Sequence, residues 1–213
     1  LKLWVDAGIS ESYPGSGTTW SDISGSGYSA TMVASPPWKG GGDAGYFEFN
    51  GSTQYMSFGA IDLLAGLSSF TFGAWVWIDA LTGGHHRIMS QEVNYYLGHY
   101  NAGMSTYLSD TSSGWPYNSV AMGSPPAGEW IYMVWRKDAS LIYHYINAVS
   151  TGLTLTMAPA VGSNARINYI GTYDTVPNQP WDGKIAAIHV YTRALSPSEI
   201  EQNFTVQRQR FGI

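Results

Sequence analysis

The stretch WDGKIAAIHVYTRALSPSEIEQNF, residues 181–204, carries the sharpest structural signals in the chain. Apolar residues alternate with others from Ile185 to Tyr191. This period of two predicts a strand, because successive side chains on a strand point to opposite faces. Asp182-Gly183 in front of it is a favoured turn pair, so we expect the chain to turn there. The stretch contains no catalytic pattern and predicts a structural element.

A helix is predicted directly after this strand. Ser196 offers a side-chain oxygen to the first-turn N–H groups, and Pro197 occupies a position where its missing N–H costs nothing. Glu199, three residues after Ser196, completes a capping box. Ile200 and Phe204 then fall on one face, four residues apart. We expect a short C-terminal helix that packs this face on the rest of the domain.

Alternation of the same kind recurs along almost the whole chain, so the sequence predicts many short strands. Strands are expected at 1–7, 28–33, 46–51, 54–59, 70–79, 87–91, 93–98, 104–109, 130–137, 141–147, 151–156, 166–171 and 184–191. We interpret 46–51 and 54–59 as a hairpin, and AIDLLAG at 60–66 as a short helix. The predicted fold class is all-β: a two-sheet antiparallel sandwich with a short C-terminal α-helix, formed by one domain over residues 1–213.

The composition favours a compact domain and excludes several function classes. Apolar residues make up 44% of the chain and charged residues only 12%, with a net charge of −5. The basic residues are scattered apart from RQR at 208–210, so no nucleic-acid-binding surface is expected. The chain has no Cys, which excludes disulfides and Cys-based metal sites.

The sequence shows no membrane-spanning run and no signal-peptide pattern. No apolar run approaches the roughly 18 residues that a membrane-spanning helix needs, so we expect no membrane insertion. The chain starts at Leu1 without a signal-peptide pattern, which predicts a fragment, a processed product or part of a longer chain.

The pattern of acidic residues argues against glycoside hydrolysis. Two carboxyl groups on one strand face need a spacing of two residues, and no Glu stands two residues from an Asp. Glu199 and Glu201 have that spacing, but on the predicted helix they point in different directions. The sequence also lacks the Gly-x-Ser-x-Gly nucleophile motif. We therefore predict a protein that is not an enzyme.

Four stretches together resemble the concanavalin A-like lectin/glucanase superfamily, and most closely its laminin-G-like jelly-roll domains. They are FEFNGSTQYMSFG (47–59), SFTFGAWVWID (69–79), GEWIYMVWRKDAS (128–140) and WDGKIAAIHVYTRALSPSEI (181–200). The last is the most specific, because its residues keep fixed spacing over twenty positions. The resemblance spans nearly the whole chain and implies a jelly-roll sandwich.

A narrower resemblance concerns residues 3–27 and 209–213, which look like laminin-G-like domains in structural proteins of bacteriophages and environmental viruses. It implies a non-enzymatic virion module attached to a capsid or tail, with Ile213 as a natural C-terminus. Contact with host-surface glycans is part of this hypothesis, and a homo-oligomer stays open. The alternative is a secreted or cell-surface carbohydrate-binding domain of a larger protein. A glycoside-active enzyme is the third, disfavoured alternative.

Aromatic side chains in predicted loops are the candidate sugar-binding residues, because a ring offers a flat apolar face and a polar edge to a pyranose. They are Trp38, Trp115, Tyr117 and Tyr173. The competing interpretation of each is local packing. For Trp75, Trp77, Trp130, Trp135 and Trp181 we expect packing rather than ligand binding.

Metal binding has weaker support. The resemblance implies Ca²⁺ as the commonest ligand of the family, with Asp182 and Asp43 as candidate ligands here. However, Asn50 and its neighbours stand where family members often place acids, which removes charge that the site would need. His85 and His86 are adjacent and point apart, so we expect a hairpin tip and no chelating pair. No resident cofactor is expected.

Overall fold

The computed structural model describes residues 1–81, 83–101, 103–109, 123–156, 160–163, 166–175 and 178–213. Within these residues, sheet A contains, in spatial order, β13 (Val149–Thr156), β12 (Leu141–Ile146), β11 (Trp130–Asp138), β7 (Phe70–Ile78), β15 (Asp182–Tyr191), β5 (Tyr46–Asn50) and β4 (Trp38–Lys39), with β1 (Leu3–Asp6) also paired to β15. Sheet B contains β10 (Gly103–Leu108), β9 (Tyr95–Tyr100), β8 (His85–Gln91), β14 (Ile167–Ile170), β6 (Tyr55–Ala60), β3 (Ala30–Val33) and β2 (Thr19–Trp20).

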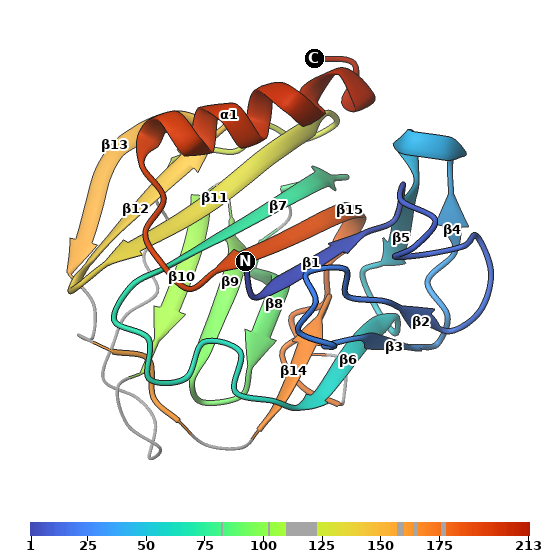
Figure 1. Ribbon diagram of the computed structural model, residues 1–213, viewed down its shortest axis with the longest axis horizontal. Helices are drawn as coiled ribbons and strands as arrows, with labels where there is room; N and C mark the ends of the chain where they lie inside the picture. Colours follow the sequence, from blue (N-terminus) through green and yellow to red (C-terminus); the bar gives the residue numbers. More distant parts are fainter. Residues whose placement is uncertain (82, 102, 110–122, 157–159, 164–165, 176–177) are drawn as a thin grey trace.

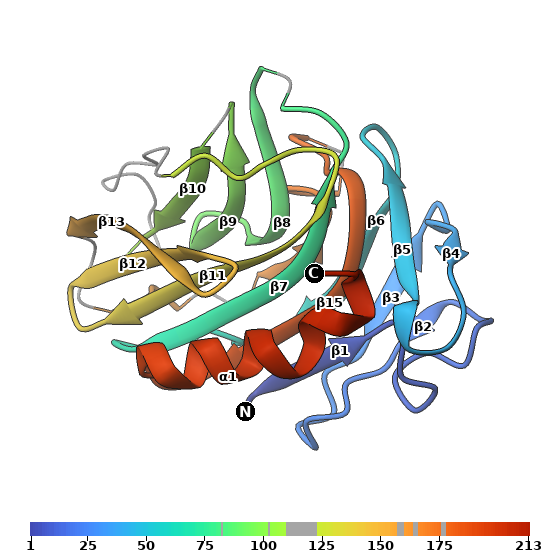
Figure 2. The same ribbon diagram turned by 90° about the horizontal axis from the view of Figure 1, so that it is seen from above.

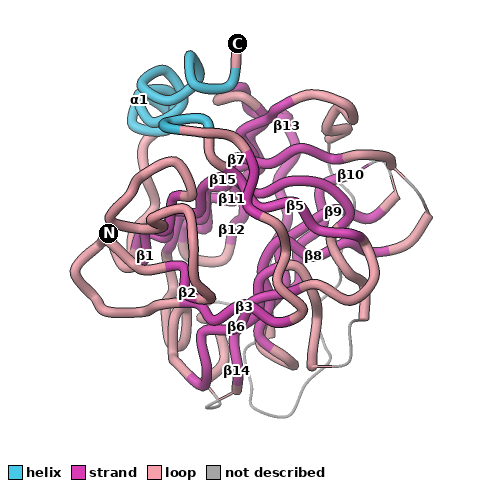
Figure 3. The backbone as a smooth tube through the Cα atoms, turned by 90° about the vertical axis from the view of Figure 1, so that its right-hand side faces the viewer, coloured by secondary structure: helices cyan, strands magenta, loops and turns pink. Residues whose placement is uncertain are grey.

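All strand pairs described are antiparallel, and the two sheets lie face to face as layers of a sandwich (Figures 1 and 3). The main core lies between them. Alternation on β7 explains how it forms, because Phe70, Phe72, Ala74, Val76 and Ile78 are all buried in this core. The predicted two-sheet sandwich and this strand face are confirmed.

A second apolar cluster lies on the outer face of sheet A, where helix α1 (Pro197–Gln207) covers the sheet (Figure 2). Trp75 points to this face, and its ring stacks on Phe204 of α1 at 5.6 Å and on Phe211 at 4.2 Å between ring centroids. Phe211 belongs to a 3₁₀ turn (Arg208–Phe211) that follows the helix. Ile200 is also buried here, so the predicted docking face of the helix is confirmed.

The helix begins as its sequence predicts. Ser196 is the N-cap: its Oγ accepts the Glu199 N–H at 3.2 Å, and the Glu199 carboxylate accepts the Ser196 N–H at 2.8 Å. Arg193 forms an exposed ion pair with Glu199, and this hydrogen-bonded pairing lowers the pKa of the Glu199 carboxyl to about 2. The capping box is confirmed.

Replacing Ser196 by Ala should lower the free energy of unfolding by about 1 kcal/mol, because one N–H of the first helical turn loses its acceptor. Urea unfolding at pH 7 measures the change. Ser26→Ala, at an exposed serine outside the helix, is the matched control and should stay within about 0.5 kcal/mol of the parent protein. Equal effects of the two substitutions would contradict the capping role.

The predicted hairpin of 46–51 and 54–59 is wrong. β5 belongs to sheet A and β6 to sheet B, so the connection crosses between the layers. Asn50 Oδ1 accepts the N–H groups of Ser52 and Thr53, and the Gly51 N–H donates to the Trp181 carbonyl at 3.0 Å. These bonds form a tight turn held on sheet A. Such a turn can lead to a paired strand or to the opposite sheet.

The predicted helix at 60–66 is also wrong, because Ala60 ends β6 and residues 61–66 have no regular secondary structure. The Ile61 carbonyl accepts the side-chain amides of Gln91 at 3.1 Å and Asn168 at 2.6 Å, so residues distant in sequence supply its hydrogen bonds. Leu63 and Leu64 are both fully buried. Burial of adjacent leucines suits an irregular segment under the sandwich better than one face of a helix.

Asp182-Gly183 does not turn the chain, contrary to expectation, and instead starts β15. Gly183 pairs with Phe49 on one side and Ile78 on the other. Its φ of +135° and a position only 2.1 Å from the Trp77 carbonyl for an added Cβ explain why glycine stands there. The glycine permits close strand packing.

His85 and His86 lie in β8 rather than at a hairpin tip, so that prediction is wrong as well. They pair across the strands with Tyr100 and His99. The His86 ring stacks on His99 at 4.6 Å, and its Nδ1 lies 2.7 Å from the Pro180 carbonyl oxygen. Both histidines therefore belong to the sheet.

Candidate functional site

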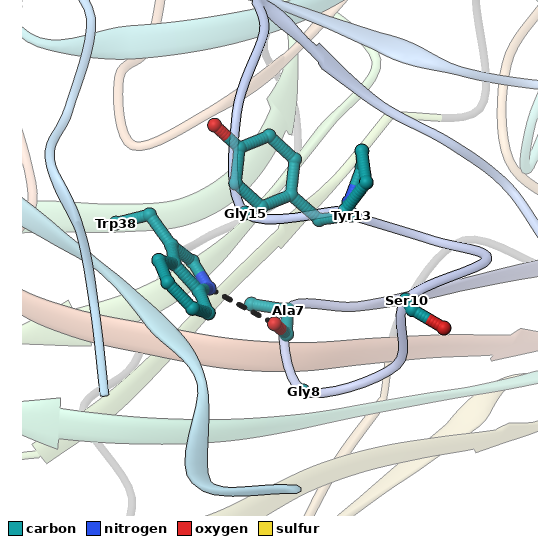
Figure 4. A pocket seen from close by; sticks show the side chains of 7 residues that line it. Ala7, Gly8, Ser10, Tyr13, Gly15 and Trp38 are labelled. Carbon is teal, nitrogen blue, oxygen red and sulfur yellow. Dashed lines mark hydrogen bonds between the residues drawn. The ribbon is translucent and has the colours of Figure 1, made fainter. Parts of the chain in front are cut away.

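Trp38 lies in the two-residue strand β4 and not in a loop, as was predicted, and it contacts the N-terminal segment that follows β1. Its indole Nε1 donates to the Ala7 carbonyl at 3.0 Å, drawn as the dashed line in Figure 4. Its ring remains partly exposed. The hydrogen bond fixes the ring orientation and leaves part of the ring accessible, which is the arrangement expected of an aromatic binding residue.

A pocket of about 180 Å³ opens beside this ring. Its lining residues are Ala7, Gly8, Ser10, Tyr13, Pro14, Gly15 and Trp38 (Figure 4). The ring centroids of Tyr13 and Trp38 lie 6.0 Å apart and the ring planes make an angle of 49°, so the two rings form inclined walls of the pocket. The pocket is smaller than the roughly 300–1,000 Å³ typical of drug-sized ligands, and it therefore suits a single sugar unit or a similarly small group.

An ion pair supports the base of this pocket. Arg210 donates from Nη1 and Nη2 to the fully buried Asp6 carboxylate at 2.8 and 2.7 Å, and from Nε to the Asp43 carbonyl at 2.6 Å. The same carboxylate accepts the Gly8 N–H at 2.9 Å. Because Gly8 lines the pocket, the C-terminal segment holds the pocket backbone in place before any ligand arrives.

A second group of aromatic residues lies on the outer face of sheet B. Tyr95 and Leu97 of β9 are buried in the core, so Tyr96 points away from it. The Tyr96 ring stacks on Tyr107 of β10 at 4.8 Å and meets Tyr173 edge-on at 6.4 Å. We call Arg87, Tyr96, Tyr107, Tyr173 and Gln179 the Arg87 cluster.

The centre of this cluster is a buried cation. Arg87 is only 1% exposed, and its guanidinium carbon lies 3.4 Å from the centroid of the Tyr96 ring. Nε donates to Gln179 Oε1 at 2.7 Å and Nη1 donates to Ser105 Oγ at 3.2 Å. Burial lowers the pKa of Arg87 to about 10, so the group stays charged at neutral pH.

The predicted site residues do not form one site. Trp38 lines the pocket, and Tyr173 belongs to the Arg87 cluster on the other sheet. Trp115 and Tyr117 lie outside the described residues. Trp75, Trp135 and Trp181 are fully buried, so their predicted packing role is confirmed.

The two candidate calcium ligands lie in different elements: Asp182 starts β15, and Asp43 lies in the 3₁₀ turn Gly42–Ala44. The Asp43 carbonyl already accepts from Arg210, which places a positive charge beside it. Among the described residues, no group of three or more His, Asp or Glu side chains could hold a metal ion. Calcium binding stays a prediction.

Sequence reasoning missed two residues of these sites. Tyr13 becomes a pocket wall only because β4 brings Trp38 next to it, and its hydroxyl is fixed by the Gly17 carbonyl at 3.1 Å. Arg87 carried only a weak signal in the sequence: a basic residue at the start of the predicted strand 87–91, directly before Ile88 and Met89. Such a residue must find partners when buried.

The geometry defines a two-sheet antiparallel jelly-roll with a docked C-terminal helix and a small aromatic pocket. A family model described as concanavalin A-like lectin/glucanases superfamily matches residues 50–201. The chain belongs to this family.

A search of curated protein sequences finds no match. In the part of the chain that the structure describes, no helix has the length and apolar character needed to cross a membrane.

Several solved structures share the fold. Domain 4 of AbnA, an extracellular arabinanase of Geobacillus stearothermophilus solved with arabinotriose, has 18% identity and a TM-score of 0.66 over 95% of this chain and 97% of that domain. The binding domain of Paraclostridial Mosquitocidal Protein 1 has 12% identity and a TM-score of 0.74 over 97% of this chain. The botulinum neurotoxin serotype D binding domain has 12% identity and a TM-score of 0.68 over 96% of this chain. The chain spans about half the length of the two toxin binding domains, 52% and 51%.

Proposed function

We propose that this chain is a non-catalytic carbohydrate-binding domain whose primary site is the pocket between Trp38 and Tyr13. The observation that carries the proposal is the partly exposed Trp38 ring, fixed by its hydrogen bond to Ala7 and facing a preformed cavity of about 180 Å³. An oriented aromatic face with polar backbone groups at its edge is what a sugar ring needs for stacking and orientation.

Two further observations support this proposal. The arabinanase domain is nearly the same size as this chain and was solved with arabinotriose bound, so one related fold accommodates a sugar ligand. Secondly, the only two carboxylates two residues apart in the sequence, Glu199 and Glu201, lie on the helix and not on a strand, and Glu48 lies opposite Lys184 across β5 and β15. This supports binding without hydrolysis. Incubation with polysaccharides should release no reducing ends, and measurable turnover would contradict the proposal.

The virion role expected from the narrower resemblance has no support in the fold or in the solved structures described above. Carbohydrate binding outside the cell, the alternative to it, therefore becomes our proposal. Attachment to capsid or tail proteins stays a prediction. Co-purification with assembled particles would favour it, particularly if the protein also bound no glycan on an array.

Replacing Trp38 by Ala should weaken sugar binding at least about tenfold, or about 1.4 kcal/mol, because the stacking wall is lost. A glycan array identifies the ligand, and isothermal titration calorimetry then measures its affinity for each variant. Trp38→Phe should retain part of the affinity, since a ring remains even though the bond to Ala7 is removed.

Trp77→Ala is the matched control for this experiment. Trp77 is also a partly exposed tryptophan, but it lies on β7 under Lys184 and does not line the pocket. It should leave sugar affinity unchanged in protein that melts cooperatively. If Trp38→Ala and Trp77→Ala bind as well as the parent protein, the pocket is not the sugar site.

A further inference from the structure

The Arg87 cluster lies apart from the Trp38 pocket. β4 stands at one end of sheet A, whereas β8, β9 and β10 are the last three strands at one end of sheet B (Figure 1). Neither Arg87 nor Tyr96 lines that pocket. Any function of the cluster is therefore additional to the sugar site proposed above.

The feature that calls for explanation is that none of the described carboxylates forms an ion pair with Arg87. In the described part of the chain, the ion pairs are formed by Arg136, Arg166, Arg193 and Arg210, each with an Asp or Glu. Arg87 is the most buried arginine described, yet its partners are Gln179, Ser105 and the Tyr96 ring, all neutral. A buried charge without an opposite charge is expensive to maintain, and an anionic ligand beside Arg87 would supply that opposite charge.

The groups around Arg87 are held rigidly. Gln179 has a φ of +58°, and its backbone carbonyl accepts the Arg87 N–H at 3.1 Å while its side chain accepts from Nε. Val93, whose backbone hydrogen-bonds Tyr173, has a φ of +61°, a strained value for a β-branched residue. Strained residues that persist in this way cluster at binding sites, where they fix side-chain positions.

The chemistry of the cluster suits a planar anion next to a ring. A guanidinium recognises a carboxylate through two parallel N–H···O bonds, and it does so most strongly where water is excluded. Gln179, which bonds Arg87, and Tyr173, which packs edge-on against Tyr96, are both partly exposed, so this side of the cluster reaches solvent. The tyrosine rings offer flat surfaces to the rest of the ligand.

We propose that the Arg87 cluster binds the carboxylate of an acidic sugar, such as a uronic acid unit, and forms a second subsite on the outer face of sheet B. The carboxylate pairs with the Arg87 guanidinium, and the sugar ring lies against Tyr173. This inference extends the proposed function from one sugar site to two sites of different charge preference.

Calorimetric titration with trigalacturonic acid and with its fully methyl-esterified form tests the inference directly, because the two differ only in the charged groups. The acid should bind at least about tenfold more tightly than the ester. Arg87→Gln should abolish this preference, and Arg87→Lys should retain part of it. Trp38→Ala should leave the preference intact. The comparison of acid with ester on the unaltered protein needs no variant, so a poorly folding Arg87→Gln would not compromise the test.

Two outcomes would overturn the inference. In the first, acid and ester bind equally or neither binds, while sugar binding at Trp38 persists. In the second, inorganic sulfate displaces trigalacturonic acid at equal concentration, which would reveal a site for any anion rather than for a sugar. Conversely, acid binding that depends on Arg87, without any effect of Trp38→Ala on neutral sugars, would refute the proposed pocket and leave this inference standing.

Discussion

Trp75→Ala is expected to lower the free energy of unfolding by about 3–5 kcal/mol, the range for removing a buried tryptophan. Trp75 is 0% exposed, and it joins β7 to the C-terminal segment through its stacking contacts with Phe204 and Phe211. For a chain of this size, each kcal/mol shifts the melting temperature by about 2–4 °C. Thermal melts and urea unfolding followed by circular dichroism measure the loss.

The matched control is Val206→Ala, which alters the opposite, solvent-facing side of α1. Val206 is 69% exposed, so its truncation should change the free energy of unfolding by less than about 0.5 kcal/mol. Limited proteolysis adds a local test, because loss of the Trp75 ring should make residues 197–213 more sensitive to cleavage than they are in Val206→Ala. If Trp75→Ala lowered the free energy of unfolding by less than about 1 kcal/mol, the helix would not depend on the stacking contacts of Trp75.

Local patterns predicted the features that depend on neighbouring residues. The capping box uses residues three positions apart, and the buried face of β7 uses every second residue, so both could be read directly. The hairpin predicted for residues 46–59 was wrong because the pairing of its second strand depends on residues far away in the sequence. A turn held by the Asn50 side chain gives no information about whether the next strand joins the same sheet, since β15 and β14 make that choice from far along the chain.

The Trp38 pocket and the Arg87 cluster could likewise be predicted only where the signal is local. Trp38 could be selected as an aromatic residue in a Pro- and Gly-rich segment, but its partner Tyr13 is 25 positions away in sequence and meets it only in the folded chain. The Arg87 cluster depends on contacts with Gln179, 92 residues away. Such pairs carry no local signal, and a single sequence could not indicate them. The unexpected strand position of Gly183 likewise reflects the approach of the Trp77 carbonyl.

Acidification is expected to destabilise the domain strongly, because buried histidines must remain neutral. Burial lowers the pKa values of His99, His144 and His189 from 6.5 to about 4. Neighbouring groups modify this effect. For His99, His86 lowers the pKa further, the hydrogen bond to the Asn101 backbone raises it, and Arg87 and His85 lower it. For His189, Asp6 raises the pKa and Arg210 lowers it.

The sign of the effect follows from proton binding. Below pH 6.5 the unfolded chain binds protons that the folded chain excludes, so stability is fully present above pH 6.5 and is lost as the pH falls towards 4. Each histidine contributes on the order of 1 kcal/mol per pH unit in that window, and the three together about 3–4 kcal/mol per unit. Urea unfolding between pH 7 and 4.5 in 0.5 M salt, which screens surface charges, measures the slope.

His144 allows this prediction to be assigned to one residue. Its Nε2 lies 2.7 Å from Thr106 Oγ1, which links the two sheets, whereas its buried Nδ1 has no hydrogen-bond partner within the described residues. The protonated ring carries an N–H on both nitrogens, so its Nδ1–H would have no acceptor among the described residues and its charge would be buried. His144→Gln keeps a group that can bond Thr106 but cannot titrate, so it should reduce the slope by about 1 kcal/mol per pH unit. An unchanged slope in His144→Gln would mean that the acid sensitivity comes from other groups.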